Sequence, residues 1–266
     1  NLPESLAAEQ QAIPESASIS NDRLNVKLVS SERRFEIHDS ETGRTWYSET
    51  ISEWLSLHDL EIEAEHRLLL HFCDRFSQQN FTAILELASI NTVRFSNDTA
   101  DLSVSHLSAS RFPPRFSTEM SAGQFVFCDR SCGVLLDQKD KTYAHWPLRV
   151  YGNTHCLDMP WVGLYDENRS DGVMLLVETP ADAEVAFVQH NDELHWPEVR
   201  WLPSMDSLGY RRSASLRFVS SGGYVSMANH YREYLKQQGR FKTLEQKAAE
   251  KPMVSRLRGA PALWGG

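Results

Sequence analysis

Side chains that could carry chemistry gather in a polar loop between two apolar runs. His155, Cys156 and Asp158 stand close together there, and His145 comes shortly before them. Imidazole, thiolate and carboxylate groups are the usual zinc ligands, and an imidazole with a carboxylate also makes an acid–base pair. The spacing matches no recognised zinc pattern, and the chain has no CxxC pair. The sequence therefore predicts no metal site and no cofactor, and it leaves acid–base chemistry open.

Tryptophan is a second candidate, because aromatic rings stack on the apolar faces of sugars and attract cations. The chain has seven tryptophans. Trp161 follows a proline at the end of the same loop, which predicts a loop–strand junction where its ring faces a ligand or a neighbouring domain. For Trp46, Trp54 and Trp146 we expect packing in a large core.

Carboxylates are the third candidate, because glycoside hydrolysis uses two of them ~5 to 10 Å apart. Several acidic residues follow one another closely, at Asp166, Glu167, Asp171, Glu178 and Asp182. Most belong to a hydrophilic turn, where Asp and Asn are ordinary turn formers, so we expect a solvated loop. The chain has no GxSxG nucleophile motif, P-loop or GxGxxG fingerprint. The sequence names no catalytic residue.

Composition limits the partners. The 266 residues are 41% hydrophobic and 24% charged, which is the globular range, with length for one large domain or two small ones. The net charge of −9 disfavours nucleic acid and anionic membrane surfaces, since both favour a basic patch. No apolar run approaches the roughly 18 residues of a membrane-spanning helix. Of the four cysteines, Cys128 and Cys132 could close a small disulfide loop, so the redox compartment stays open.

Most of the chain reads as β-strands. Leu24, Val26 and Leu28 alternate with polar residues, and short runs of this kind recur, separated by turn-forming residues, with no helix of convincing length among them. Parallel sheets need helical crossovers, so we predict a mainly β fold, a large antiparallel β-sandwich over residues 21–221. Residues 1–20 are polar and are predicted to be a flexible N-terminal segment.

The last part of the chain has a different period. Apolar residues from 224 to 235 recur at three- and four-residue steps, which predicts a helix that ends at Gly239. Thr243 and Gln246 fit a capping box, which starts a second helix that ends before Pro252. We assign residues 222–256 to a helical connector. The short apolar run 257–266 is predicted to be one further strand.

Five stretches together resemble the region before the catalytic barrel in the glycoside hydrolase 101 and 129 group. They are TGRTW at 42–46, MPWVGL at 159–164, VMLLVETPADA at 173–183, MANHYREYL at 227–235 and LRGAPALWG at 257–265. The resemblance covers most of the chain and is best after residue 155. It implies a β-supersandwich of galactose-mutarotase type, then a (β/α)8 barrel with retaining chemistry on α-galactosaminides or anhydro-galactosides.

In such a barrel the catalytic carboxylates stand at the ends of later strands. The resemblance therefore places them beyond Gly266, with residues 257–266 as the truncated start of the barrel. We expect this chain to be the non-catalytic N-terminal sandwich of a secreted or periplasmic bacterial glycoside hydrolase. Its partners would be carbohydrate and the C-terminal catalytic barrel. The residues expected to border the substrate are Trp161, Asp158, His155 and Trp264.

Two alternatives remain. A stand-alone carbohydrate-binding module would need an exposed aromatic platform. A mutarotase-like sugar epimerase would use a histidine base with a carboxylate, for which His145, His155 and Glu178 are the candidates.

Overall fold

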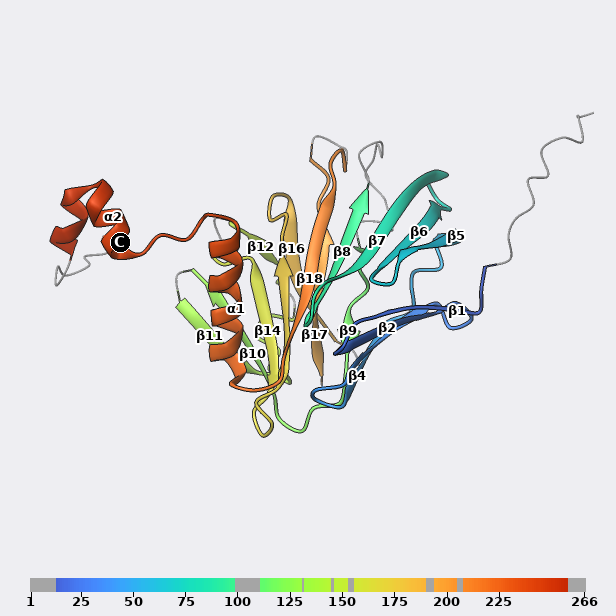
Figure 1. The fold of residues 1–266 in the computed structure, drawn as a ribbon, viewed down its shortest axis with the longest axis horizontal. Coiled ribbons are helices and arrows are strands. Elements are labelled where there is room, and N and C mark those ends of the chain that lie inside the picture. The colour runs from blue at the N-terminus through green and yellow to red at the C-terminus, as the bar shows by residue number, and fades with distance from the viewer. Residues whose placement is uncertain are drawn as a thin grey trace, which may run out of the picture. The chain divides into compact units, whose positions relative to one another are not determined.

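The computed structural model describes residues 13–98, 111–130, 132–144, 146–152, 156–189, 194–204 and 208–257. The described residues form two sheets and three helical segments (Figure 1). The smaller sheet has the strand order β1-β2-β3-β4-β9. Its strands are β1 (Ser16–Ser20), β2 (Leu24–Val29), β3 (Arg34–Asp39), β4 (Arg44–Ser48) and β9 (Phe116–Ser117).

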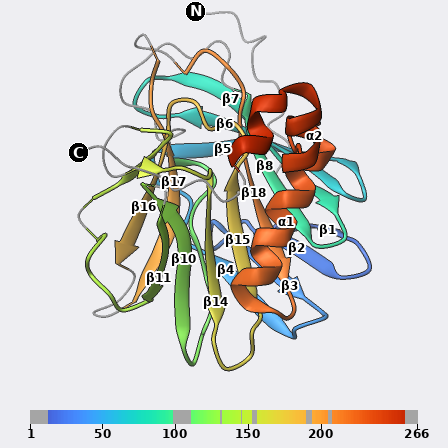
Figure 2. The same ribbon diagram turned by 90° about the vertical axis from the view of Figure 1, so that its left-hand side faces the viewer.

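The larger sheet has the order β17-β16-β12-β13-β10-β14-β15-β18-β8-β7-β6-β5, with β11 paired to β10. Figure 2 shows β10, β14, β15 and β18 side by side. Its strands are β5 (Leu55–Ala64), β6 (Arg67–Asp74), β7 (Gln79–Ser89), β8 (Thr92–Asp98), β10 (Gly123–Asp129), β11 (Cys132–Asp137), β12 (Leu148–Val150), β13 (Cys156–Leu157), β14 (Trp161–Asp166), β15 (Gly172–Val177), β16 (Ala183–Gln189), β17 (His195–Trp201) and β18 (Arg212–Val219).

Strand pairing confirms the predicted mainly β, antiparallel architecture. In the described part of the chain β12 pairs with β13 in parallel, and the other paired strands run antiparallel. Alternation produces the buried faces: in β2, Leu24, Val26 and Leu28 are buried while the residues between them are not. The central strands β14 and β15 are instead buried at every residue, so both of their faces are covered.

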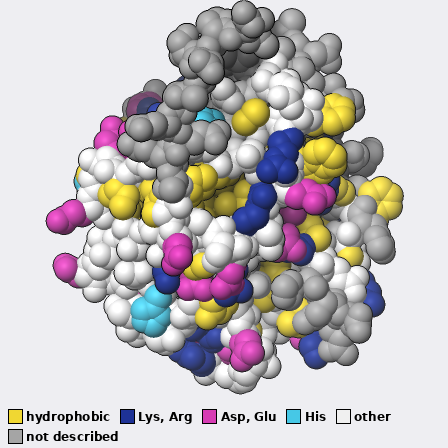
Figure 3. All heavy atoms as spheres, turned by 90° about the vertical axis from the view of Figure 1, so that its right-hand side faces the viewer, with side chains coloured by type: hydrophobic (Ala, Val, Ile, Leu, Met, Phe, Trp, Pro, Cys, Tyr) yellow, Lys and Arg dark blue, Asp and Glu magenta, His cyan; other side chains and the backbone are white. Residues whose placement is uncertain are grey.

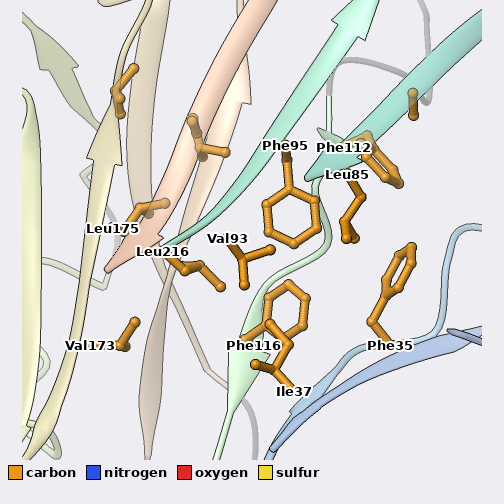
Figure 4. Close-up of a cluster of buried hydrophobic side chains, with 14 of the residues drawn as sticks. Phe35, Ile37, Leu85, Val93, Phe95, Phe112, Phe116, Val173, Leu175 and Leu216 are labelled. Atoms are coloured by element: carbon orange, nitrogen blue, oxygen red, sulfur yellow. The ribbon is translucent and has the colours of Figure 1, made fainter. Parts of the chain in front are cut away.

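Aromatic side chains join the two sheets. Phe35 of β3 lies 6.2 Å, centroid to centroid, from both Phe95 of β8 and Phe112. Phe116 of β9 lies 5.5 Å from Phe95, and Figure 4 shows these rings pointing toward one another between the sheets. Such pairs add stability beyond their buried area. Trp46 of β4 is 1% exposed, which confirms the predicted core position for this tryptophan.

The N-terminal boundary differs from the prediction. Residues Ser16–Ser20, assigned from sequence to a flexible segment, form β1 and pair with β2 from Ser16↔Val29 to Ser20↔Asn25. Ala17 and Ile19 are buried on one face of this strand. The surrounding residues are polar, so the short alternation was not recognised in the sequence. A strand this short is stabilised only by pairing with the edge of β2.

The helical segments are α1 (Gly223–Gln237), α2 (Leu244–Glu250) and the 3-10 helix η2 (Pro252–Leu257). Gly239 has a φ of +66°, as a left-handed residue after a helix requires. The Thr243–Gln246 capping box is confirmed in both directions. The described residues divide into two compact units, one that ends at Tyr224 and one that begins at Val225. Among the described residues, no helix is both long and apolar enough to cross a membrane. The predicted barrel strand lies almost wholly outside the described residues.

A glycine pair makes the corner where α1 begins. Gly222 and Gly223 have φ values of +78° and +50°. The Gly223 N–H donates to the Ser170 carbonyl at 2.9 Å, and a Cβ at this position would lie 3.1 Å from the Tyr165 ring. Both the backbone conformation and the close ring favour glycine here.

Candidate functional site

Trp161 occupies the predicted junction, as the first residue of β14, paired with Leu176 of β15. Its side chain, however, is only 5% exposed. A ring enclosed to this degree offers almost no area for a sugar to stack on. In this conformation Trp161 contributes packing at the start of the strand rather than a binding platform.

Asp158 lies beside two thiols. The Cys156 thiol donates to Asp158 Oδ1 at 3.6 Å, and the Asp158 N–H donates to the Cys128 carbonyl at 3.1 Å. Burial, followed by the nearby Asp158 charge, raises the pKa of both thiols. Protonated thiols are poor nucleophiles and poor metal ligands. This cluster therefore does not form a reactive cysteine site.

All four cysteines are free. In the β10–β11 pair, Cys132 stands opposite Asp129 and Cys128 stands opposite Gly133. Successive side chains of a strand point to opposite faces, so Cys128 and Cys132 lie on different faces of the sheet. The small disulfide loop that the sequence left open does not form here.

Three of the candidate residues fall outside the described part of the chain. They are His155, Trp264 and His145. For the epimerase alternative this leaves Glu178, which the structure describes in full. Arg94 Nε donates to Glu178 Oε2 at 2.7 Å, and Arg217 Nη2 lies 3.5 Å from Glu178 Oε1. Both carboxylate oxygens therefore belong to an ion-pair cluster.

The sequence predicted a solvated loop for the acidic turn between β14 and β15, but two of its carboxylates are buried. Asp166 and Asp171 are 1% and 2% exposed, and both contact the Arg44 guanidinium. Arg44 Nη2 lies 2.8 Å from Asp166 Oδ2 and 2.8 Å from Asp171 Oδ1. Arg44 belongs to β4, so this network links the smaller sheet to the larger one. The sequence could not reveal the pairing, since the partners lie far apart along the chain.

The ionisation of Asp166 is set by its surroundings. Burial alone raises the pKa of this carboxyl, but hydrogen bonds from the Ser121 N–H, the Arg44 guanidinium and the Asn168 N–H outweigh it. The resulting pKa is about 2. A carboxyl that stays ionised at neutral pH cannot donate a proton as a general acid. The network is therefore a structural one.

An exposed aromatic pair stands at one end of β5 and β6. Trp54 and Phe76 are 52% and 64% exposed, and their ring centroids lie 6.5 Å apart at an interplanar angle of 85°. The core position predicted for Trp54 is wrong, and so is that for Trp146, which is 58% exposed. Composition could not separate these rings from Trp46, because exposure depends on which loop the fold brings to the surface.

The loops that carry the pair are held by backbone hydrogen bonds. The Arg75 N–H donates to the Trp54 carbonyl at 2.7 Å, which ties the two loops together. Asp74 Oδ1 accepts from the Phe76 N–H at 2.9 Å and from the Ser77 N–H at 3.0 Å. Asp74 is fully buried. The aromatic pair therefore sits on a fixed frame.

A cavity of about 270 Å³ is lined in part by Leu55 and Arg75, and together with Trp54 and Phe76 we call it the Trp54 site. Trp54 and Phe76 each adjoin one of its lining residues in sequence. The lining comprises Ile13, Leu28, Ser30, Arg33, Ile51, Leu55, Ser56, Leu57, Phe72 and Arg75. Figure 3, which faces the side where β1, β5 and β6 lie, shows hydrophobic side chains in a hollow beside basic side chains.

The polar groups of this cavity could orient a ligand. Arg33 Nη2 donates to the carbonyls of Ser52 and Leu55 at 2.6 Å each, which fixes this guanidinium at the wall. Ser30 Oγ is buried with no hydrogen-bond partner in the described part of the chain. A mostly apolar lining with a few convergent polar groups is typical of small-ligand sites.

Comparisons with known proteins add a fold match. No protein-family model matches the chain, and no curated protein matches it in sequence. The solved structure of the alpha-N-acetylgalactosaminidase NagBb from Bifidobacterium bifidum in complex with GalNAc is similar, with a TM-score of 0.70 and 17% identity. The match covers 91% of this chain but only 42% of NagBb. At this identity the likeness shows the fold.

Two further solved structures match the chain. A quadruple mutant of NagBb matches with a TM-score of 0.70 and 18% identity over the same shares of both chains, 91% and 42%. A galactose mutarotase related enzyme from Lactobacillus acidophilus has a TM-score of 0.48 and 9% identity, over 78% of this chain and 99% of that one. This chain therefore has the fold of the part of NagBb that it matches, which is 42% of that protein.

Proposed function

We propose that this chain is the non-catalytic N-terminal β-sandwich of a bacterial glycoside hydrolase that acts on α-linked galactose-type sugars. Galactosaminides and anhydro-galactosides are the substrate class. In this role the sandwich supports a catalytic barrel, supplied by another part of the same polypeptide, and borders the substrate. The observation that carries the proposal is the fold match to NagBb, over 91% of this chain and 42% of that enzyme.

The carboxylates of the described residues support a structural role. Three of the five acidic residues named from the sequence, Asp166, Asp171 and Glu178, are engaged with Arg44, Arg94 and Arg217. Carboxylates that catalyse glycoside hydrolysis need free access to the glycosidic oxygen and the anomeric carbon. These three carboxylates instead hold strands together.

A secreted or periplasmic location belongs to the same proposal, since polymeric substrates lie outside the cell. The proposal also includes a position beside the substrate for Asp158, His155 and Trp264. Trp161 would then act by packing the start of β14, because its ring is buried.

Hydrolysis of 4-nitrophenyl α-N-acetylgalactosaminide tests the proposal. We expect no turnover by this chain alone and turnover by the whole polypeptide expressed from its source. Turnover by the chain alone would contradict the non-catalytic role. Absence of turnover by the whole polypeptide on galactosaminide and anhydro-galactoside substrates would contradict the substrate class.

The epimerase alternative has its own measurement. NMR of freshly dissolved α-galactose follows its conversion to the β anomer. We expect the rate with this chain to equal the spontaneous rate, because both oxygens of Glu178 are held by guanidinium groups. An accelerated rate that falls in the Glu178→Gln variant would restore the epimerase.

A second candidate function is carbohydrate binding at the Trp54 site. The exposed pair Trp54 and Phe76 is the specific observation that favours it, because a binding module needs an aromatic platform beside polar groups. When an aromatic ring stacks on a bound ligand, removing that ring typically lowers the affinity for the ligand roughly tenfold or more. This function is compatible with the sandwich standing beside a catalytic domain.

Binding of the chain to an array of galactose- and N-acetylgalactosamine-terminated glycans tests it. We expect binding that falls at least about tenfold in Trp54→Ala and in Phe76→Ala. Trp146→Ala is the matched control, because Trp146 is similarly exposed but, unlike Trp54 and Phe76, adjoins no lining residue in sequence. Equal losses in all three variants, or no binding by the unmodified chain, would exclude the Trp54 site as the platform.

A further inference from the structure

We propose that Asp59, Glu61 and His71 bind one divalent transition-metal ion on the outer face of the β5–β6 pair. One ligand atom from each side chain lies within 4.8 Å of the others. The proposal does not rest on the proposed glycosidase role, because none of the three residues belongs to the sites described above. It departs from the sequence-based expectation that the chain has no metal site.

Strand register brings the three residues together. Asp59 of β5 stands opposite His71 of β6, and Glu61 follows two positions along β5. Residues i and i+2 of a strand point to the same face, so both carboxylates share a face with the imidazole. Leu70 and Phe72, the neighbours of His71, are buried on the core side. The cluster therefore faces away from the core.

A β-bulge adjusts this arrangement. The register shifts between Leu57 and Asp59, which leaves His58 as the extra residue of β5. A bulge re-aims the side chains beside it and is frequent next to functional sites. Without the shift, His58 rather than Asp59 would stand opposite His71. The irregularity therefore places a carboxylate where regular pairing would not.

The imidazole of His71 is held in the orientation that a ligand needs. Its Nδ1 lies 3.1 Å from Thr82 Oγ1 on the neighbouring strand β7. With Nδ1–H donating to that hydroxyl, Nε2 carries the lone pair, and it lies 3.4 Å from Glu61 Oε1. A hydrogen bond to the second ring nitrogen is how proteins fix the tautomer and direction of a metal-bound histidine.

Within the described residues, Nε2 makes no hydrogen bond, although it lies at ion-pair distance from Glu61. It is shielded from solvent. A lone pair that faces a carboxylate oxygen at this distance is repelled by it, and a cation between the two removes the repulsion. Glu61 is 59% exposed, so its side chain is free to close around an ion.

The ligand types select the class of metal. One imidazole nitrogen with two carboxylate oxygens suits Zn²⁺, Co²⁺ or Ni²⁺, with water completing the coordination. Ca²⁺ and Mg²⁺ take oxygen ligands almost exclusively, so the imidazole disfavours them. Since β5 is the terminal strand of the larger sheet, an ion that joins β5 to β6 also fastens this edge.

Isothermal titration of the tag-free, chelator-treated chain with ZnCl₂ or CoCl₂ tests the proposal. We expect one ion per chain and, at a metal concentration about 100 times the Kd, a rise in Tm of roughly 5 to 10 °C. MgCl₂ should give neither. His71→Ala should abolish binding, and Asp59→Asn and Glu61→Gln should each weaken it about tenfold or more.

The matched control is His38→Ala. His38 Nδ1 also contacts a threonine across a strand pair, Thr45 Oγ1 at 3.1 Å, but among the described residues it belongs to no carboxylate cluster. This variant should bind like the unmodified chain. Binding that survives His71→Ala, or is lost only in Cys132→Ser and so comes from the exposed thiol, would overturn the assignment. Absence of binding by the unmodified chain would reduce the cluster to a His71–Glu61 ion pair.

Discussion

At the scale of single residues, the Arg44 network links buried charges from distant parts of the chain. Arg44 reaches from β4 to two carboxylates of the β14–β15 turn, and its Nη1 also donates to the Glu119 carbonyl. Breaking a buried ion pair by removing one partner leaves the other charge buried and uncompensated. The residues involved are polar, yet they belong to the interior.

Removing the charge of Asp166 should therefore destabilise the fold. For Asp166→Asn we expect the free energy of unfolding, measured by urea denaturation, to fall by about 3 to 5 kcal/mol. The neighbouring Glu167 is exposed, so Glu167→Gln should change it by less than about 0.5 kcal/mol. Similar losses in both variants would mean that the turn, rather than the ion pair, carries the stability.

The same carboxylate makes stability depend on pH. Its folded-state pKa is about 2, below the ordinary value of 3.8, so the unfolded state binds the proton more readily. The stabilisation is complete above about pH 4 and disappears as the pH falls toward 2, a loss of about 2 kcal/mol.

Urea denaturation at pH 6 and pH 3 measures this effect. The decrease in stability between the two pH values should be smaller in Asp166→Asn than in the unmodified chain. An equal decrease in both proteins would assign the acid sensitivity to other carboxylates.

At the scale of elements, close approach between strands restricts side-chain size. Gly172 begins β15 and pairs with Tyr165 and Val219 on its two sides. A Cβ at Gly172 would lie 2.2 Å from the Leu164 carbonyl oxygen and 2.6 Å from Tyr165 Cα. These are backbone atoms, so the strands themselves would have to move.

Gly172→Ala should lower the free energy of unfolding by at least about 1 to 3 kcal/mol, which is the usual effect of overpacking. Gly133 is the matched control: it also lies in a strand, β11, and a Cβ there would meet no atom within 4 Å. Gly133→Ala should be neutral or slightly stabilising, because alanine loses less backbone entropy than glycine on folding. Equal effects at both positions would contradict the close approach.

At the scale of the whole molecule, the fold match leads to an expectation about the natural polypeptide. This chain spans 42% of the length of NagBb, and its mass is 30.4 kDa. If the sandwich serves a catalytic barrel, the intact protein from its source should have a mass well above that value. Intact mass spectrometry measures it, and a mass near 30.4 kDa would favour the carbohydrate-binding module instead.

Local sequence patterns determined the elements. The two-residue alternation of Leu24, Val26 and Leu28 is set by which side of a strand each residue faces, so it predicted both the strand and its buried face. The capping box at Thr243 and the left-handed Gly239 are equally local, and both are confirmed. The antiparallel sandwich followed from many short strands without helical crossovers.

Tertiary structure alone decided which side chains meet. Arg44 and Asp166, Asp59 and His71, and Trp54 and Phe76 come together through strand register and loop position, which no short-range pattern encodes. The same cause buried Trp161 and exposed Trp54, opposite to what their sequence surroundings suggested. The periodicity of a strand predicts which of its side chains face the core. A site also needs side chains from neighbouring strands, and the periodicity does not say which strands those are.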